Sequence, residues 1–180
     1  MDAIDTGQRK WSRAEVAELL ISRNALTDLK LDHALQIVRL LTPQRVAAGT
    51  VLIEEGVTST GYMALVLEGK AVVLNAVRGS DDSVLLSHLG CGAVFGELGV
   101  LDGKPRSATV TAVTDMHIAV LDRPGLARLI DTVPSVACSL LGAIIVRVAE
   151  RLRATNTKVQ DLSAANQALQ EQLKNSSLRA

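Results

Sequence analysis

Aromatic residues are scarce in this chain of 180 residues, which holds one Phe, one Tyr and one Trp. Proteins that bind single-stranded nucleic acid stack bases on several aromatic side chains, so this scarcity argues against such a platform. Net charge is missing as well, because 19 Lys and Arg residues balance 19 Asp and Glu residues. Without a basic excess to contact phosphates, we expect no direct nucleic-acid partner.

Hydrophobic runs of membrane-spanning length are also missing. The apolar run Leu140–Val146 is interrupted by Gly142 and followed by Arg147. The first residues include Asp2 and Asp5 and no apolar core, unlike a signal peptide. We therefore expect no membrane partner and a cytoplasmic location.

Cysteine is rare, and the histidines are dispersed. Cys91 and Cys138 form no metal or redox motif, and we expect both to be small buried residues in a reducing compartment. His33, His88 and His117 are too far apart in the sequence to suggest a metal site. No nucleophile–base pattern stands out either, so we expect no metal, no cofactor and no catalysis.

Helical signals come first along the chain, in a predicted N-terminal region over residues 1–43. Ser12 and Glu15 form a capping-box pattern before an apolar stripe. A second helix fits the apolar spacing from Leu31 to Leu41, and Pro43 ends it.

Short β-rich runs separated by glycines follow, in a predicted domain over residues 44–133. No helix of crossover length lies between them, which indicates an antiparallel sheet. We expect an α+β fold whose centre is an antiparallel β-roll, similar to a jelly-roll barrel, closed by a short helix that begins near Pro124. The predicted strands are Val51–Ile53, Met63–Leu67, Ala71–Val77, Val84–Leu89, Ala108–Val113 and His117–Leu121.

A long helix is predicted over residues 134–180, with a heptad pattern typical of a two-stranded coiled coil. A single helix packed on its own roll is the alternative, but a small roll cannot cover the helix beyond about residue 160. Asn166 at an a position favours an in-register pair, so we expect a homodimer through this helix. The a positions are Ile145, Leu152, Val159, Asn166 and Leu173, and the d positions are Val148, Thr155, Leu162 and Leu169.

The segment from Phe95 to Val110 carries the most specific chemistry. It places one carboxylate, Glu97, nine residues before one guanidinium, Arg106, with small or hydroxylated neighbours. A carboxylate can accept a hydrogen bond from a ligand hydroxyl, and a guanidinium offers a planar fork to two phosphate oxygens. The alternative, a surface ion pair, would contribute about 0–1 kcal/mol to stability.

This segment resembles the phosphate-binding cassette of cyclic-nucleotide-binding domains, the family of the catabolite activator protein, cyclic-AMP-dependent kinase regulatory subunits and nucleotide-gated channels. The resemblance extends over about residues 30–165. Its cassette is one residue shorter than that of the catabolite activator, as in the kinase subunits and channels. Further matches are Gly49, Glu55-Gly56, Tyr62, Leu67-Glu68-Gly69 and the helix segment 151–159.

The resemblance implies a ligand, cyclic GMP or cyclic AMP, and a role for each matching residue. Glu97 would bind the ribose 2′-hydroxyl and Arg106 the phosphate, a charge-assisted contact worth roughly 1.5–3 kcal/mol. Residues Gly96 to Leu98, after Phe95, would open a short helix with its amides toward the phosphate. Further phosphate or base contacts are implied for Ser107, Ala108, Thr155 and Asn156.

The choice of base stays open at this point. A hydroxyl after the cassette arginine, here Ser107, is common in members of the family that bind cyclic GMP and also occurs in the catabolite activator, which binds cyclic AMP. Asn156 can serve either purine, because an amide is both donor and acceptor. The shorter cassette, Ser107 and Asn156 together favour cyclic GMP slightly.

Three function classes compete. A sensory domain would pass a ligand-driven change through the coiled coil to a downstream domain or partner. A fragment of a transcription regulator that resembles the catabolite activator and binds cyclic AMP is the alternative, but only about eighteen residues follow Leu162, too few for a helix-turn-helix. An inert β-roll scaffold is the third. Because the heptads continue almost to Ala180, we expect a truncated chain and favour the sensory domain.

Overall fold

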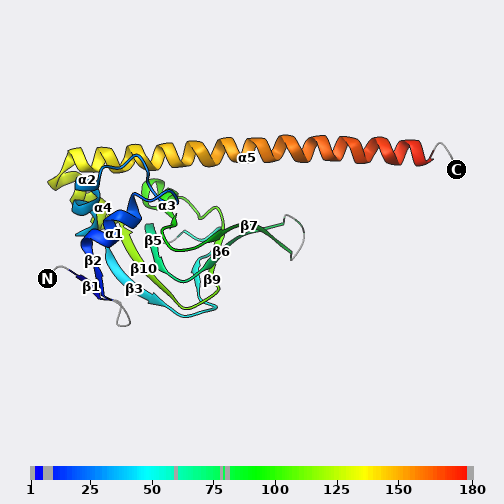
Figure 1. Ribbon diagram of the computed structural model, residues 1–180. Helices are drawn as coiled ribbons and strands as arrows, with labels where there is room; N and C mark the ends of the chain where they lie inside the picture. The colour runs from blue at the N-terminus through cyan, green and yellow to red at the C-terminus, as the bar shows by residue number, and fades with distance from the viewer. Residues whose placement is uncertain (1–2, 6–9, 59–60, 78, 80–81, 178–180) are drawn as a thin grey trace. The chain divides into compact units, whose positions relative to one another are not determined.

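The computed structural model describes residues 3–5, 10–58, 61–77, 79 and 82–177. The chain forms two units, Met1–Ile144 and Ile145–Ala180, and each is described by itself. Figure 1 shows the first unit as strands with short helices at one end. The described part of the second unit, residues 145–177, is a single helical segment.

The first unit begins with a hairpin and two short helices. Strands β1 (Ala3–Asp5) and β2 (Lys10–Ser12) pair antiparallel and were not predicted. Helix α1 (Arg13–Leu20) begins at the predicted capping box: Ser12 Oγ accepts from the Glu15 amide at 3.1 Å, and Glu15 Oε2 accepts from the Ser12 amide at 2.7 Å. Helix α2 (Leu31–Val38) ends before the predicted limit.

Two four-stranded antiparallel sheets make up the roll, which confirms the predicted fold class. One sheet has the order β3–β10–β5–β8, and the other has the order β4–β9–β6–β7. Their bounds are β3 (Thr42–Val46), β4 (Val51–Ile53), β5 (Tyr62–Glu68), β6 (Ala71–Ala76), β7 (Ser83–Leu89), β8 (Val94–Phe95), β9 (Thr109–Ala112) and β10 (Met116–Asp122).

The core of the roll lies between these sheets and is built from apolar side chains of both. It includes Val66 and Ile118, both fully buried, and Phe95, which is 5% exposed. Strand β3 contains Pro43, which a sheet tolerates because β3 is an edge strand and needs no inner ladder bond there. Phe95 ends β8 in this core, so the cassette begins from a fixed point.

One further helix lies within the roll, and two helices follow it in the sequence. Helix α3 (Glu97–Asp102) lies between β8 and β9. Helix α4 (Arg123–Thr132) begins at Asp122, whose carboxylate accepts from the Gly125 amide at 2.7 Å. Helix α5 (Pro134–Ser177) is the predicted long helix. None of the helices in the described ranges combines the length and apolar character needed to cross a membrane.

The prediction of two buried cysteines is wrong, since Cys91 and Cys138 are both exposed. Cys91 lies in the turn between β7 and β8, where its thiol contacts the Leu67 carbonyl oxygen at 3.1 Å from outside the core. Cys138 lies beside the buried stripe of α5 that contains Ala137 and Leu140. A small apolar residue can therefore border a buried stripe without belonging to it.

Candidate functional site

The cassette backbone is shaped by two glycines in the left-handed region. Gly96 is the N-cap residue of α3 at φ +78°, and Gly103 follows its last turn at φ +64°. Residues with a β-carbon rarely adopt this region, so both ends of the short helix depend on glycine. The prediction that a short helix opens at residues 96–98 is confirmed, because α3 begins at Glu97.

Three glycines bring the cassette into close contact with its surroundings. A β-carbon on Gly96 would lie 2.6 Å from the carbonyl oxygen of Tyr62. A β-carbon on Gly99 would overlap the guanidinium of Arg106, and one on Gly61 would overlap the carbonyl oxygen of Gly99. Residues 61–62 at the start of β5 therefore lie against Gly96 and against Gly99 of α3.

Arg106 is buried, with 7% of its surface exposed. Its backbone is fixed, because its amide donates to the Val57 carbonyl at 3.2 Å and its carbonyl accepts from the Gly56 amide at 2.9 Å. Nη1 donates to the Gly96 carbonyl at 3.2 Å, which brings the side chain back to the start of α3. Nη2 is buried and has no hydrogen-bond partner in the part of the chain that the structure describes. A buried guanidinium donor of this kind is costly unless a ligand satisfies it.

Glu97, the predicted partner of the ribose hydroxyl, is 3% exposed at the first position of α3. Acidic and basic side chains are rarely buried to this extent in proteins unless they have a structural or functional role. Of the charged residues of the cassette, the structure therefore buries Glu97 and Arg106, whereas Asp102 and Lys104 are exposed. That burial argues against a pair of ordinary solvated surface charges.

The other predicted residues of the cassette differ in exposure. Phe95 packs in the core of the roll, so its side chain anchors the first residue of the cassette there. Leu98 and Ala108 are half-buried, and Ser107 is exposed. The Ser107 carbonyl accepts from Asn75 Nδ2 at 2.9 Å, which ties the residue after Arg106 to β6.

Thr155 and Asn156 lie on α5 in the second unit, and both are exposed. The Thr155 hydroxyl donates to the Arg151 carbonyl one turn earlier, at 2.8 Å. Their role toward the base stays a prediction that rests on the resemblance.

Tyr62, one of the residues that match in the resemblance, packs against the core of the roll. The guanidinium of Arg106 lies over its ring, 5.1 Å from the ring centroid, and the sequence predicted no such contact. Burial raises the pKa of the Tyr62 hydroxyl above its ordinary value, and the positive charge of Arg106 offsets part of that rise. The two residues are far apart in the sequence, and no spacing pattern could have paired them.

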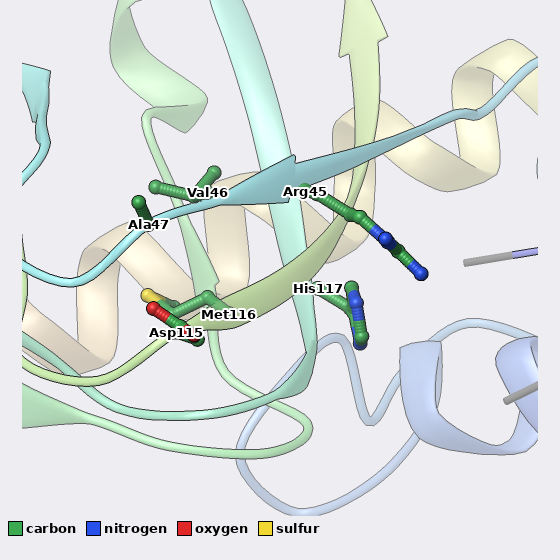
Figure 2. A pocket seen from close by; sticks show the side chains of 6 residues that line it. All are labelled: Arg45, Val46, Ala47, Asp115, Met116 and His117. Atoms are coloured by element: carbon green, nitrogen blue, oxygen red, sulfur yellow. The ribbon is translucent and has the colours of Figure 1, made fainter. Parts of the chain in front are cut away.

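A hollow lies away from the cassette, where the end of β3 meets the start of β10, as Figure 2 shows. Its volume is about 210 Å³. The charged residues that line it each have an interaction partner within this protein. The His117 ring pairs with Glu68 at 3.3 Å, the Asp115 carboxylate accepts from the Ala48 amide at 2.9 Å, and Arg45 also has a partner. The lining residues are Arg45, Val46, Ala47, Asp115, Met116 and His117.

Residues 43–133 match the family model described as the cyclic nucleotide-binding domain. This match covers the roll, the cassette and α4. The chain belongs to the cyclic nucleotide-binding domain family.

Three relatives of this cyclic nucleotide-binding domain illustrate the range of the similarity. The cAMP-dependent protein kinase regulatory subunit of Yarrowia lipolytica is 35% identical over 108 residues, which are 60% of this chain and 28% of that protein. The crystal structure of the Thermus thermophilus catabolite activator protein superposes with a TM-score of 0.67 at 24% identity, over 81% of this chain and 63% of that one. At that identity it supports the fold.

The third relative is a solved structure from work on a cyclic-GMP-dependent signalling pathway that regulates bacterial phytopathogenesis. It is 35% identical with a TM-score of 0.56, and the match covers 68% of this chain and 96% of that one. The chain spans less than a third of the length of the curated relatives that it matches. The similarity therefore concerns a regulatory domain and not those whole proteins.

Proposed function

We propose that this domain binds a cyclic 3′,5′-nucleotide at the cassette, with Arg106 on the phosphate and Glu97 on the ribose 2′-hydroxyl. One observation carries the proposal: a buried guanidinium whose Nη2 has no hydrogen-bond partner among the described residues, in the same short segment as a buried carboxylate. A cyclic nucleotide supplies both complements, since its phosphate accepts from guanidinium donors and its hydroxyl donates to a carboxylate. Nothing in this chemistry calls for a metal or a reaction, so the proposed role is regulatory.

The test is titration calorimetry with the Arg106→Ala variant. Loss of a charge-assisted contact worth roughly 1.5–3 kcal/mol corresponds to affinity about 10- to 150-fold weaker, with the fold retained. Lys104→Ala is the matched control, because Lys104 is an exposed cation in the same loop. Its affinity should stay within about threefold of the wild type, as expected for screened surface charges. Wild-type affinity in Arg106→Ala would refute the site.

For the base, we favour cyclic GMP. The exposed Ser107 supports this choice, as does the 35% identity to the structure from the cyclic-GMP-dependent pathway. The similarity to regulatory subunits of cAMP-dependent protein kinase, at 29–35% identity, instead favours cyclic AMP. Calorimetry with both nucleotides decides between them, and a preference of tenfold or more for cyclic AMP would overturn the choice.

For signal transmission, we propose that α5 pairs with the α5 of a second copy and passes the ligand-driven change to an output domain or partner. The apolar side chains at the seam positions are exposed along the second unit, at 60% for Leu152, 55% for Val159 and 70% for Leu162. A repeated apolar stripe of this kind marks an interaction surface. The ligand would act by shifting a two-state equilibrium, to the extent that it binds one state more tightly. The exposed residues Cys91 and Cys138 form no disulfide, which fits the proposed cytoplasmic location.

The alternative is a fragment of a transcription regulator that binds cyclic AMP. It is favoured by the similarity to the N-terminal domain of a Streptomyces coelicolor transcriptional regulator, which is 28% identical over 77% of this chain and 94% of that one. The reading frame beyond Ala180 distinguishes the two: a helix-turn-helix there would support this alternative.

A further inference from the structure

The contact between Tyr62 and Arg106 joins two parts of the roll. Tyr62 is the first residue of β5, and Arg106 lies in the loop before β9. The guanidinium carbon lies 5.1 Å from the centroid of the ring, within the roughly 6 Å over which an aromatic face attracts a cation. Both residues are at least partly withdrawn from water, which strengthens such an attraction.

Tyr62 is held in place by contacts of its hydroxyl group and of its backbone. The Tyr62 hydroxyl donates to the Leu52 carbonyl, which joins the ring to β4. The Tyr62 backbone pairs with Asp122 of β10, and its carbonyl lies against Gly96. Tyr62 therefore offers Arg106 a fixed surface and does not follow the guanidinium if it moves.

A ring holds a guanidinium in a way that suits anion binding. A carboxylate partner would occupy the N–H groups of Arg106 and would repel an incoming phosphate. An aromatic ring instead contacts the flat face of the guanidinium, carries no charge, and leaves the N–H edge available. At this edge, Nη1 of Arg106 donates to the Gly96 carbonyl at 3.2 Å, and Nη2 has no hydrogen-bond partner among the residues that the structure describes.

We propose that Tyr62 is a positioning residue that holds the face of Arg106 and leaves its N–H edge for the phosphate. The inference deepens the proposed function and rests on it, because the purpose of the positioning is to bind the cyclic nucleotide.

The test compares Tyr62→Leu, which removes the aromatic face, with Tyr62→Phe, which keeps the face and removes only the hydroxyl. The first readout is the Nε–H proton resonance of Arg106 in the ligand-free protein, because a ring shifts the resonance of a proton held over its face. We expect the shift in the wild type and in Tyr62→Phe, and its loss in Tyr62→Leu. The second readout is calorimetry with cyclic GMP and cyclic AMP. We expect affinity about tenfold weaker in Tyr62→Leu and within about threefold of the wild type in Tyr62→Phe.

A double-mutant cycle separates positioning from general damage to the fold. If Tyr62 acts through Arg106, Tyr62→Leu should change the residual affinity of an Arg106→Ala protein by less than about twofold. An equal loss of affinity in both backgrounds would overturn the inference, as would an Arg106 resonance that is unchanged in Tyr62→Leu. Failure of the wild-type protein to bind either nucleotide would overturn the proposed function instead, and the resonance alone would still decide whether Tyr62 orients Arg106.

Discussion

Gly99 of α3 leaves the space that the guanidinium of Arg106 occupies. A β-carbon on Gly99 would overlap Nη1 and would also lie 2.5 Å from Cζ of the same side chain. Gly99 is not in the left-handed region, so its backbone alone does not require glycine. Glycine is required at position 99 because the guanidinium of Arg106 occupies the space of a β-carbon.

Gly99→Ala should therefore impair ligand binding more than folding. The overlapping atoms are the far end of a flexible side chain, so the added methyl group displaces Arg106 and leaves the backbone in place. We expect affinity for the cyclic nucleotide to fall about tenfold or more, as for loss of a charge-assisted contact. Calorimetry measures the affinity, and thermal unfolding measures the stability.

Gly142→Ala is the control for that variant, because Gly142 is an exposed helical residue with no neighbour within 4 Å of an added β-carbon. It should stabilise the protein by up to about 1 kcal/mol through helix propensity and leave affinity unchanged. Unchanged affinity in Gly99→Ala would show that Arg106 does not need its present position.

Glu97→Gln should remove the discrimination between ribose and deoxyribose ligands. The buried carboxylate of the wild type accepts from the 2′-hydroxyl in our proposal, so a 2′-deoxy cyclic nucleotide should bind about tenfold more weakly. Without the charge, the difference between the two ligands should shrink to about threefold or less. Competition titrations with both ligands measure it. Equal affinity of the wild type for both would contradict the assignment of Glu97.

The titration of Tyr62 should report the charge of Arg106. Tyr62 is the one tyrosine in the chain, so the ultraviolet absorbance of tyrosinate follows this residue alone. Its pKa is raised by burial and lowered by Arg106, so Arg106→Ala should raise it further. A lower tyrosine pKa in that variant would contradict the contact.

The raised pKa also predicts how stability depends on pH. A group whose pKa is higher in the folded protein contributes stability that is fully present below its unfolded pKa, about 10, and is lost as pH rises through the folded value. Tyr62→Phe should therefore lose less stability than the wild type between pH 10 and the folded pKa. Urea unfolding across this range measures the difference, and parallel losses would contradict the prediction.

Asn166→Leu should loosen the choice of oligomer. A buried amide at an a position selects a two-stranded pair at a cost in stability, and leucine there permits other assemblies. We expect a dimer in the wild type and a mixture with larger species in the variant, measured by sedimentation equilibrium. Gln167→Leu, one position outside the seam, should leave the dimer unchanged. A monomeric wild type would refute the coiled coil.

The strands of the roll were predictable where local pattern and tertiary pairing agree. The predicted Val51–Ile53 is β4, and five further predicted runs correspond to β5, β6, β7, β9 and β10. Strand β3 was missed because Pro43 was taken as the end of a helix, whereas pairing with β10 makes it an edge-strand residue. Strand β8 was missed because two residues carry no periodicity.

The cassette was predictable to the extent that its chemistry lies within one stretch of sequence. The carboxylate, the guanidinium and the glycine before α3 are all visible there. What no local pattern encodes is the path of the chain that returns Arg106 to Gly96 and places it over Tyr62. Those contacts depend on pairings between distant strands, so they became visible only in the structure.

The contact between Gly61 and Gly99 limits the directions in which the cassette can move. The carbonyl of Gly99 already occupies the space where any other residue at position 61 would carry its β-carbon, so α3 rests against the start of β5. Compression at such a contact is steeply repulsive, whereas separation or sliding is not. A ligand that displaces α3 therefore has to move it away from β5 or along β5. The contact thus restricts the direction of this movement in the ligand-free protein as well.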